Sequence, residues 1–164
     1  MSNDHQAVVT ENRLRGLRVA ITGGTAGLGH ALVSALHAHG AHVAFVARTA
    51  SRVAAVASEL PGTHGIVGDV AVKEAIHPLA LQILGRLGGV DALINNASAL
   101  GAPPLRPLAD TDCEVFEQVL ATNVLGPFRL TKALLGALAS SARNGRGAVV
   151  INVSSDATVS AART

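Results

Sequence analysis

Residues 17–29 read Leu-Arg-Val-Ala-Ile-Thr-Gly-Gly-Thr-Ala-Gly-Leu-Gly, and this stretch decides the fold. Its first six residues form a mainly apolar run typical of a buried strand, and a helix is predicted from Gly27 to His39. The glycines Gly23, Gly27 and Gly29 lie at the junction. A dinucleotide pyrophosphate needs this arrangement, because a tight turn brings the backbone close and the start of the helix offers free N–H groups. The alternative is an ordinary glycine turn.

Outward from this stretch, short apolar runs alternate with longer helical patterns. Strands are predicted over 41–47, 63–67, 90–95 and 148–154, helices over 50–60, 72–87 and 111–141, and a proline-containing loop over 97–109. Runs such as Val149-Val150-Ile151 are apolar on both faces, as parallel strands covered by helices require. Right-handed βαβ units then predict an α/β fold, a Rossmann-type doubly wound parallel sheet in the order 3-2-1-4-5.

Composition limits the remaining classes of protein. The chain has 164 residues, of which 49% are hydrophobic and 15% charged, with a net charge of +2. These values predict one folded domain over 16–164 behind a flexible arm over 1–15, with neither a nucleic-acid footprint nor a membrane span. A single cysteine and no secretory signal pattern at the N-terminus favour a cytoplasmic protein.

The end of the second predicted strand indicates the choice of cofactor. An acid there would bind the ribose 2′-hydroxyl of NAD, whereas an arginine accepts the 2′-phosphate of NADP. The sequence places Arg48 at this point and has no acid between Gly40 and Ser58. NADP is therefore favoured over NAD; the alternative is a solvated arginine at the start of a helix.

The combination of motifs resembles the short-chain dehydrogenase/reductase family. Its TGxxxGxG signature is matched by Thr22, Gly23, Gly27 and Gly29. The resemblance implies hydride transfer between NADP(H) and a small carbonyl or alcohol substrate. It also implies the cofactor contacts and catalytic residues, which are Thr22, Gly23, Thr25, Gly27, Leu28, Gly29, Arg48, Asp69, Val70, Asn96 and Ala97 for the cofactor, and Ser155 and Asn123 for catalysis.

Two departures from the family pattern stand out. Ser98 replaces the glycine of the NNAG motif, which begins here at Asn95. More severely, the family's acid/base pair is a Tyr and a Lys in a YxxxK motif that would fall beyond Thr164, and the chain contains no tyrosine. A truncated or incomplete sequence would have this form. The alternative to an enzyme is therefore an inactive nucleotide-binding fragment, and we expect residues 1–164 alone to have negligible turnover.

The residues around the two catalytic candidates, Asn123 and Ser155, also support these roles without reference to the family. Residues 111–114 form a capping-box pattern that predicts a helix start. Pro127 lies four residues after Asn123 and would deprive its carbonyl of a helical partner, as the family's water-holding Asn requires. A tolerated proline kink is the alternative. Ser155 follows the last predicted strand, and Ser154 is the fallback for orienting a substrate oxygen.

Other reactive residues carry weaker signals. His37, His39 and His42 flank a predicted helix end without a carboxylate, which favours a solvated helix terminus over a metal site. Cys113 has no histidine partner in its half of the sequence and is interpreted as structural. The family resemblance implies a homo-oligomer built partly on the long helix, although the partner helix would follow Ser155.

Overall fold

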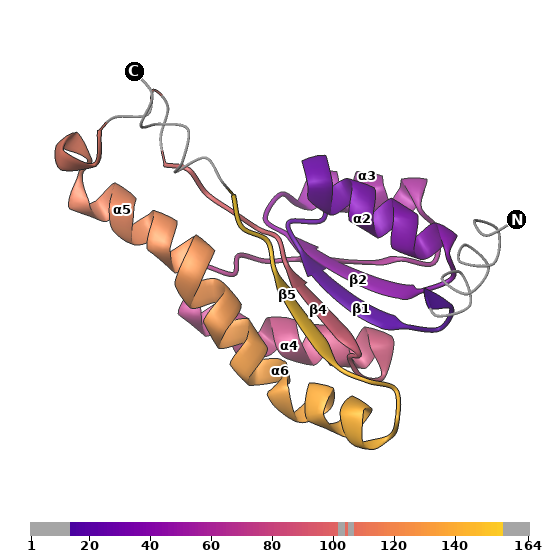
Figure 1. Cartoon of the computed structure of the whole chain (residues 1–164). Helices are drawn as coiled ribbons and strands as arrows, with labels where there is room; N and C mark the ends of the chain where they lie inside the picture. Colours follow the sequence, from indigo (N-terminus) through magenta and orange to yellow (C-terminus); the bar gives the residue numbers. More distant parts are fainter. Residues whose placement is uncertain (1–13, 102–103, 105–106, 156–164) are drawn as a thin grey trace, which may run out of the picture.

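A parallel sheet of five strands forms the centre of the molecule (Figure 1). The computed structural model describes residues 14–101, 104 and 107–155, so residues 1–13 of the arm predicted over 1–15 lie outside the described residues. The strands are β1 (Arg18–Thr22), β2 (His42–Ala47), β3 (His64–Val67), β4 (Ala92–Asn95) and β5 (Val149–Asn152). Their order is β3-β2-β1-β4-β5, which confirms the predicted order and puts β1 at the centre.

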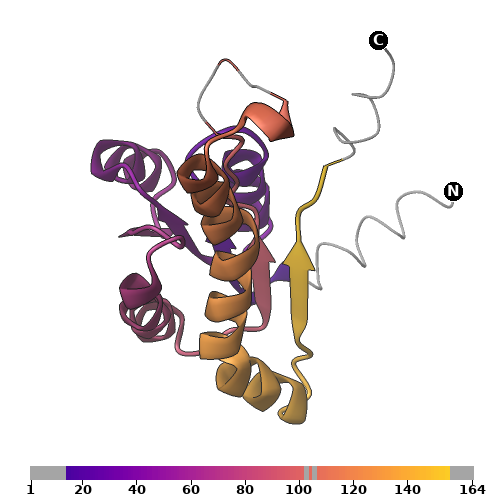
Figure 2. The same ribbon diagram turned by 90° about the vertical axis from the view of Figure 1, so that its left-hand side faces the viewer.

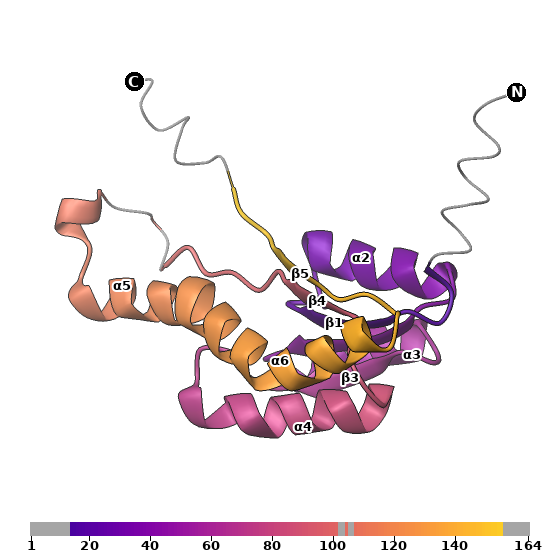
Figure 3. The same cartoon turned by 60° about the horizontal axis from the view of Figure 1, so that its bottom comes forward.

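Helices cover both faces of this sheet except at β5, whose residues are all exposed although the run 149–151 is apolar (Figure 3). One face packs against α2 (Gly27–Ala38) and α3 (Ala50–Glu59), and the other against α4 (Ile76–Leu87) and α6 (Gly126–Arg143). Successive residues of β1 alternate between the two layers, with Val19 and Ile21 facing α2 and α3 while Ala20 faces the α4 side. This alternation explains why the strands are apolar on both faces.

The strand order changes direction at β1, because β2 and β3 lie on one side of β1 and β4 and β5 lie on the other. β1 pairs with β2 on one side (Val19 opposite Val43) and with β4 on the other (Val19 opposite Ala92). Loops that leave neighbouring strands toward opposite faces open a crevice at such a point. The glycine loop follows β1 and therefore lies at this switch point.

The predicted helix over 72–87 begins as a short 3-10 turn, η1 (Lys73–Ala75), before α4. Pro78 is accommodated in the first turn of α4, where its missing N–H costs nothing. The loop after β4 contains a second such turn, η2 (Leu108–Asp110). The other helix and strand bounds differ from the predicted ones by at most a few residues, within the usual fraying of element ends.

The long helix predicted over 111–141 is interrupted. It consists of α5 (Cys113–Leu120), a π-helical segment η3 (Ala121–Leu125) and α6. In η3 the N–H of Gly126 bonds the carbonyl of Ala121, five residues back, and Pro127 lies in the first turn of α6. The predicted irregularity at Pro127 is thus a π turn that precedes the proline.

The predicted capping box does not form. Asp112 is the N-cap of α5 and makes no side-chain cap bond. The hydroxyl of Thr111 donates instead to the carbonyl of Pro107 at 3.1 Å. This prediction was wrong because the preceding turn η2 draws Thr111 away from the helix start.

Candidate functional site

A cleft of roughly 1250 Å³ lies at the carboxyl ends of the strands. Loops that follow the strands form its walls, together with η3 and α6. Of the residues predicted for the site, those that line this cleft are Gly23, Thr25, Gly27, Leu28, Gly29, Arg48, Asp69, Val70, Asn96, Ala97, Asn123 and Ser155. The fold therefore gathers candidates from distant parts of the sequence into one place.

The glycine loop leaves no room for side chains at three of its positions, Gly23, Gly24 and Gly29, and at Gly24 an added Cβ would meet the Phe45 side chain. Gly23 has a φ of +72°, and a Cβ there would lie 2.9 Å from the Cα of Ala97. A Cβ on Gly29 would collide with the carbonyl oxygen of Gly23. Gly27 has open space around it but a φ of +51°, so its conformation alone favours glycine. These positions allow the loop to approach the loop after β4 closely.

The start of α2 faces the cleft without a cap. Its N-cap residue is Ala26, which makes no side-chain cap bond, and no acid lies in the first turn. The N–H groups of the first helical turn have no partner within the helix, and they carry the positive end of the helix dipole. Because Gly27, Leu28 and Gly29 all line the cleft, this end of α2 offers donors to a phosphate.

Thr22 lies below the cleft and not in its wall. It is 3% exposed, and its hydroxyl oxygen accepts the N–H groups of Asn96 and Ala97, each at 3.0 Å. The Asn96 side-chain amide donates in turn to the carbonyls of Thr22 (3.0 Å) and Gly23 (3.2 Å). Thr22 and Asn96 therefore join the glycine loop to the loop after β4.

Positive side chains outnumber negative ones in the described wall of the cleft. Arg48 and Arg52 lie at the end of β2 and in α3, and Lys132 lies in α6. Asp69 is the one acid among these described lining residues, and its carboxylate accepts the N–H of Ala71 at 2.9 Å. Arg48 is exposed and has no ion-pair partner among the described residues, which leaves its guanidinium available to an anion.

Asn123 uses its side chain to hold a loop. Its amide nitrogen donates to the carbonyl of Ala99, and its amide oxygen accepts the N–H of Ala99, both at 2.8 Å. This reciprocal pair ties η3 to the loop after β4. The side chain is thus already engaged, and the backbone carbonyl is the part of Asn123 that the predicted water-holding role concerns.

Sequence reasoning missed a polar group between the sheet and α6. The amide nitrogen of Asn95 donates to the oxygens of Asn152 (2.9 Å) and Thr131 (3.3 Å), and all three residues line the cleft. The side-chain oxygen Oδ1 of Asn95 is buried without a partner among the described residues. Helical spacing contained a signal for Thr131, because Asn123, Pro127 and Thr131 recur every four residues and share one face.

The histidines and Cys113 are not arranged as the ligands of one metal ion in the described part of the chain. Among the described residues, no group of three or more His, Cys, Asp or Glu side chains is placed to hold a metal ion. His39 lies against the carbonyl of Ala35 at 2.7 Å, as a helix terminus allows, and Cys113 is exposed. No helix in the described ranges is long and apolar enough to cross a membrane.

Comparison with known proteins decides the family. A sequence model described as short chain dehydrogenase matches residues 18–163. The chain belongs to the short-chain dehydrogenase family. This short-chain dehydrogenase chain is 37% identical to L-fucose dehydrogenase of Bos taurus over 143 residues, which is 87% of this chain and 50% of that protein. It is 33% identical to L-xylulose reductase of Bos taurus over 145 residues, or 88% and 55% of the two chains.

Solved structures agree with this assignment. The 3-ketoacyl-(acyl-carrier-protein) reductase of Brucella melitensis, complexed with NADH, superposes with a TM-score of 0.81 at 26% identity, covering 87% of this chain and 58% of that one. A short chain dehydrogenase of Burkholderia cenocepacia in complex with NADP gives 0.70 at 31% identity, covering 77% and 53%. This short-chain dehydrogenase chain thus spans about half the length of the relatives it matches.

Proposed function

We propose that the chain forms the nucleotide-binding half of an oxidoreductase that transfers hydride between NADP(H) and a small carbonyl or alcohol substrate. The observation that carries this proposal is the uncapped start of α2 beside a glycine loop too tight for side chains, both in one cleft. Membership of the short-chain dehydrogenase family supports the reaction class.

The residues of the cleft divide the binding of the cofactor among them. The glycine loop and the first turn of α2 hold the pyrophosphate, with Thr25 and Leu28 at its sides. Asp69 and Val70 would border the adenine, and Asn96 and Ala97 would border the nicotinamide. When bound, the nicotinamide supplies or accepts the hydride.

Arg48 supports a preference for NADP over NAD. It is a cleft-lining cation without an ion-pair partner among the described residues, and Arg52 lies beside it in the same wall. Solved relatives hold either nucleotide, NADH in the Brucella melitensis enzyme and NADP in the Burkholderia cenocepacia enzyme. Cofactor preference therefore rests on the local cations of this chain.

Ser155 and Asn123 supply what this chain offers to the chemistry. The hydroxyl of Ser155 would donate to the substrate oxygen at the end of β5, with Ser154 beside it. The carbonyl of Asn123 would accept a hydrogen bond from a water in a proton relay, while its side chain holds the neighbouring loop. Both residues line the cleft.

A titration of the purified chain with NADPH and NADH, followed by nicotinamide fluorescence, tests the proposal. Wild type should bind NADPH more tightly, and Arg48→Ala should lose about 10- to 100-fold in NADPH affinity with little change for NADH, since a hydrogen bond to a charged group is worth about 1.5–3 kcal/mol. Arg143→Ala, an exposed arginine outside the described cleft wall, is the matched control. Equal affinities in wild type would contradict the NADP preference, and no binding of either nucleotide would contradict the function.

A catalytically inactive nucleotide-binding fragment is the second candidate, and the lack of any tyrosine in the sequence favours it. General acid/base assistance is typically worth about 10²–10⁴-fold, and an unassisted serine hydroxyl does not replace it. Assays with NADPH and a panel of ketones and aldehydes should give negligible turnover for residues 1–164. A robust rate that collapses in Ser155→Ala would show instead that this chain completes its own site.

Association and location are further parts of the proposal. Exposed apolar side chains along α5 and η3 that do not line the cleft, among them Phe116, Leu120 and Leu125, support a homo-oligomer that uses this face. The single cysteine supports a cytoplasmic location. Sedimentation of the purified protein and cell fractionation test the two statements separately.

A further inference from the structure

β5 lies at the edge of the sheet, beside β4 (Figure 2). All of its residues are exposed, and Ile151 at its centre is 45% exposed. Within the described chain its ladder partner is β4, with Val149 opposite Ala92 and Asn152 opposite Asn95. Yet β5 leads directly to Ser154 and Ser155 in the cleft, so something other than burial must fix its register.

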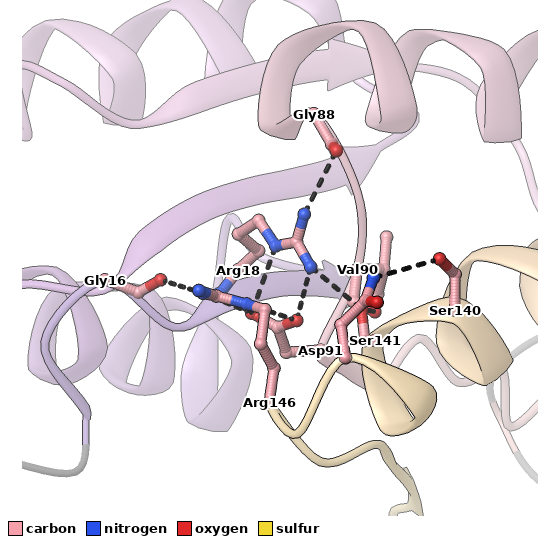
Figure 4. Close-up of polar contacts among 9 residues, drawn as sticks. Gly16, Arg18, Gly88, Val90, Asp91, Ser140, Ser141 and Arg146 are labelled. Carbon is pink, nitrogen blue, oxygen red and sulfur yellow. Dashed lines mark hydrogen bonds and ion pairs between the residues drawn. The ribbon is translucent and has the colours of Figure 1, made fainter.

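The amino-terminal end of β5 is held by a buried acid (Figure 4). The side chain of Asp91 is 0% exposed and bonds two arginines, Arg18 of β1 (Nη2 to Oδ1, 2.6 Å) and Arg146 of the α6–β5 turn (Nη2 to Oδ2, 2.9 Å). Arg146 also donates from Nη2 to the carbonyl of Gly16 at 2.7 Å. The backbone of Asp91 adds a bond of its own, because its carbonyl accepts the N–H of Val149 at 3.0 Å.

Ser141, near the end of α6, completes this arrangement. Its hydroxyl donates to the carbonyl of Val90 at 2.8 Å and accepts from Nη2 of Arg18 at 2.8 Å. The N–H of Arg146 in turn bonds the carbonyl of Ser141 at 3.0 Å. The whole turn between α6 and β5 is therefore fastened to β1 and to the start of β4.

A second polar contact holds the other end of β5. The side-chain Nδ2 of Asn95 donates to Oδ1 of Asn152 at 2.9 Å, and the backbone carbonyl of Asn95 accepts the N–H of Val153 at 2.9 Å. Side-chain contacts thus lie at both ends of β5, between Arg146 and Asp91 before the strand and between Asn95 and Asn152 at its last residue. The ionic contact lies at the end of the sheet opposite the cleft.

We propose that Arg146 and Asp91 are positioning residues that fix the register of β5 on β4 and so deliver Ser154 and Ser155 to the cleft. The consequence of this proposal for substrate orientation rests on the proposed function, whereas the role of the two residues in fixing the register of β5 does not. Loss of Arg146 would free β5 without orphaning the buried acid, because Asp91 keeps bonds from Nε, Nη2 and the backbone N–H of Arg18. The effect of Arg146 is therefore local to β5 and its flanking turn.

Hydrogen exchange of backbone amides in the purified chain, read by mass spectrometry, tests this. In Arg146→Ala, amides of residues 149–153 should exchange at least about tenfold faster, since the bonds lost are charge-assisted. Amides of β1 and β2 should keep their protection. Arg146→Lys should restore part of the protection, because it keeps the charge but not the simultaneous bonds to Asp91 and Gly16.

Arg143→Ala is the matched control, since this exposed arginine lies three positions earlier and has no ion-pair partner among the described residues. The proposal is overturned by unchanged exchange of residues 149–153 in Arg146→Ala. It is equally overturned by a uniform acceleration across all strands, or by a wild-type β5 that has no protection to lose. We expect Arg146→Ala to bind NADPH as wild type does, because Arg146 lies at the end of the sheet opposite the cleft. A wild-type chain that fails to bind NADPH would refute the proposed function. The exchange result would still stand, because it does not depend on the cofactor.

Discussion

The two sides of the sheet's switch point are stabilised in different ways. The strands β1 and β2, which α2 and α3 cover on one face, bury almost all of their own apolar side chains, and Ile21, Val43 and Phe45 are fully enclosed. On the other side β5 exposes all of its residues, and α5 has no buried residue. Where burial is complete, position follows from non-directional packing. Where burial is missing, position depends on a few directional contacts between charged and amide groups, and each of these can be removed singly.

Removal of Asp91, which joins Arg18 of β1 to Arg146 before β5, should have the largest effect on the free energy of unfolding. Asp91→Ala leaves Arg18 and Arg146 facing a site without an acid, and the loss of one partner from a buried ionic group typically costs about 3–5 kcal/mol. The free energy of unfolding from urea titrations should fall by this order. Asp110→Ala, an exposed acid in η2, is the control and should stay within about 0.5 kcal/mol of wild type.

The same residue predicts the response to acid. Burial alone would raise the pKa of Asp91, but hydrogen bonds from Arg18 and Arg146 outweigh it and hold this pKa well below its usual range. A carboxyl whose folded pKa is depressed adds stability above its unfolded pKa of 3.8 and loses it as the pH falls further. Wild type should therefore lose stability more steeply than Asp91→Ala below that pH; parallel curves would contradict the assignment.

A substitution in the well-packed half should have an intermediate effect. Gly29→Ala adds a Cβ that meets the Gly23 carbonyl, and overpacking of this kind costs about 1–3 kcal/mol. Because the glycine loop must shift, NADPH affinity should fall with stability. Gly136→Ala in α6 is the matched control, since nothing lies near its Cβ and a helical alanine is favoured by up to about 1 kcal/mol. If Gly29→Ala bound NADPH as wild type does, the loop would not be the phosphate site.

The smallest effect on the free energy of unfolding is expected from His64, at the start of β3 in the well-packed half. It tests whether a titrating group contributes to the stability of this half besides apolar burial. Burial lowers the pKa of His64 below 6.5, and the nearby charges of Arg86 and His42 lower it further. The unfolded chain then takes up a proton first as the pH falls below 6.5, so stability should decrease between neutral and mildly acidic pH. Urea midpoints at two pH values should show this slope in wild type and less of it in His64→Gln. An equal slope in both would assign the pH dependence to another group.

Some parts of the site could be read from the residues because they depend on local rules. The glycine loop is one, since Gly23, Gly27 and Gly29 follow an apolar strand at the spacing that a tight turn and a helix start require. Arg48 is another, because the end of β2 is a fixed position relative to that loop. The pair of bonds between the Asn123 side chain and the Ala99 backbone could not be predicted in this way, since the two residues are 24 positions apart and no periodic pattern relates them.

Sequence alone determined the alternation of strands and helices, the parallel order of the sheet and the place of the glycine loop. These follow from hydrophobic periodicity and from the handedness of βαβ connections, which act over short distances along the chain. Tertiary structure alone decided that Asp91 joins Arg18 to Arg146, that Thr22 supports the cleft from below, and that the long helix passes through a π turn. Each of these results depends on which hydrogen-bonding group, distant in sequence, comes to lie next to a buried donor or acceptor. The packing of the helices on the sheet determines these neighbours.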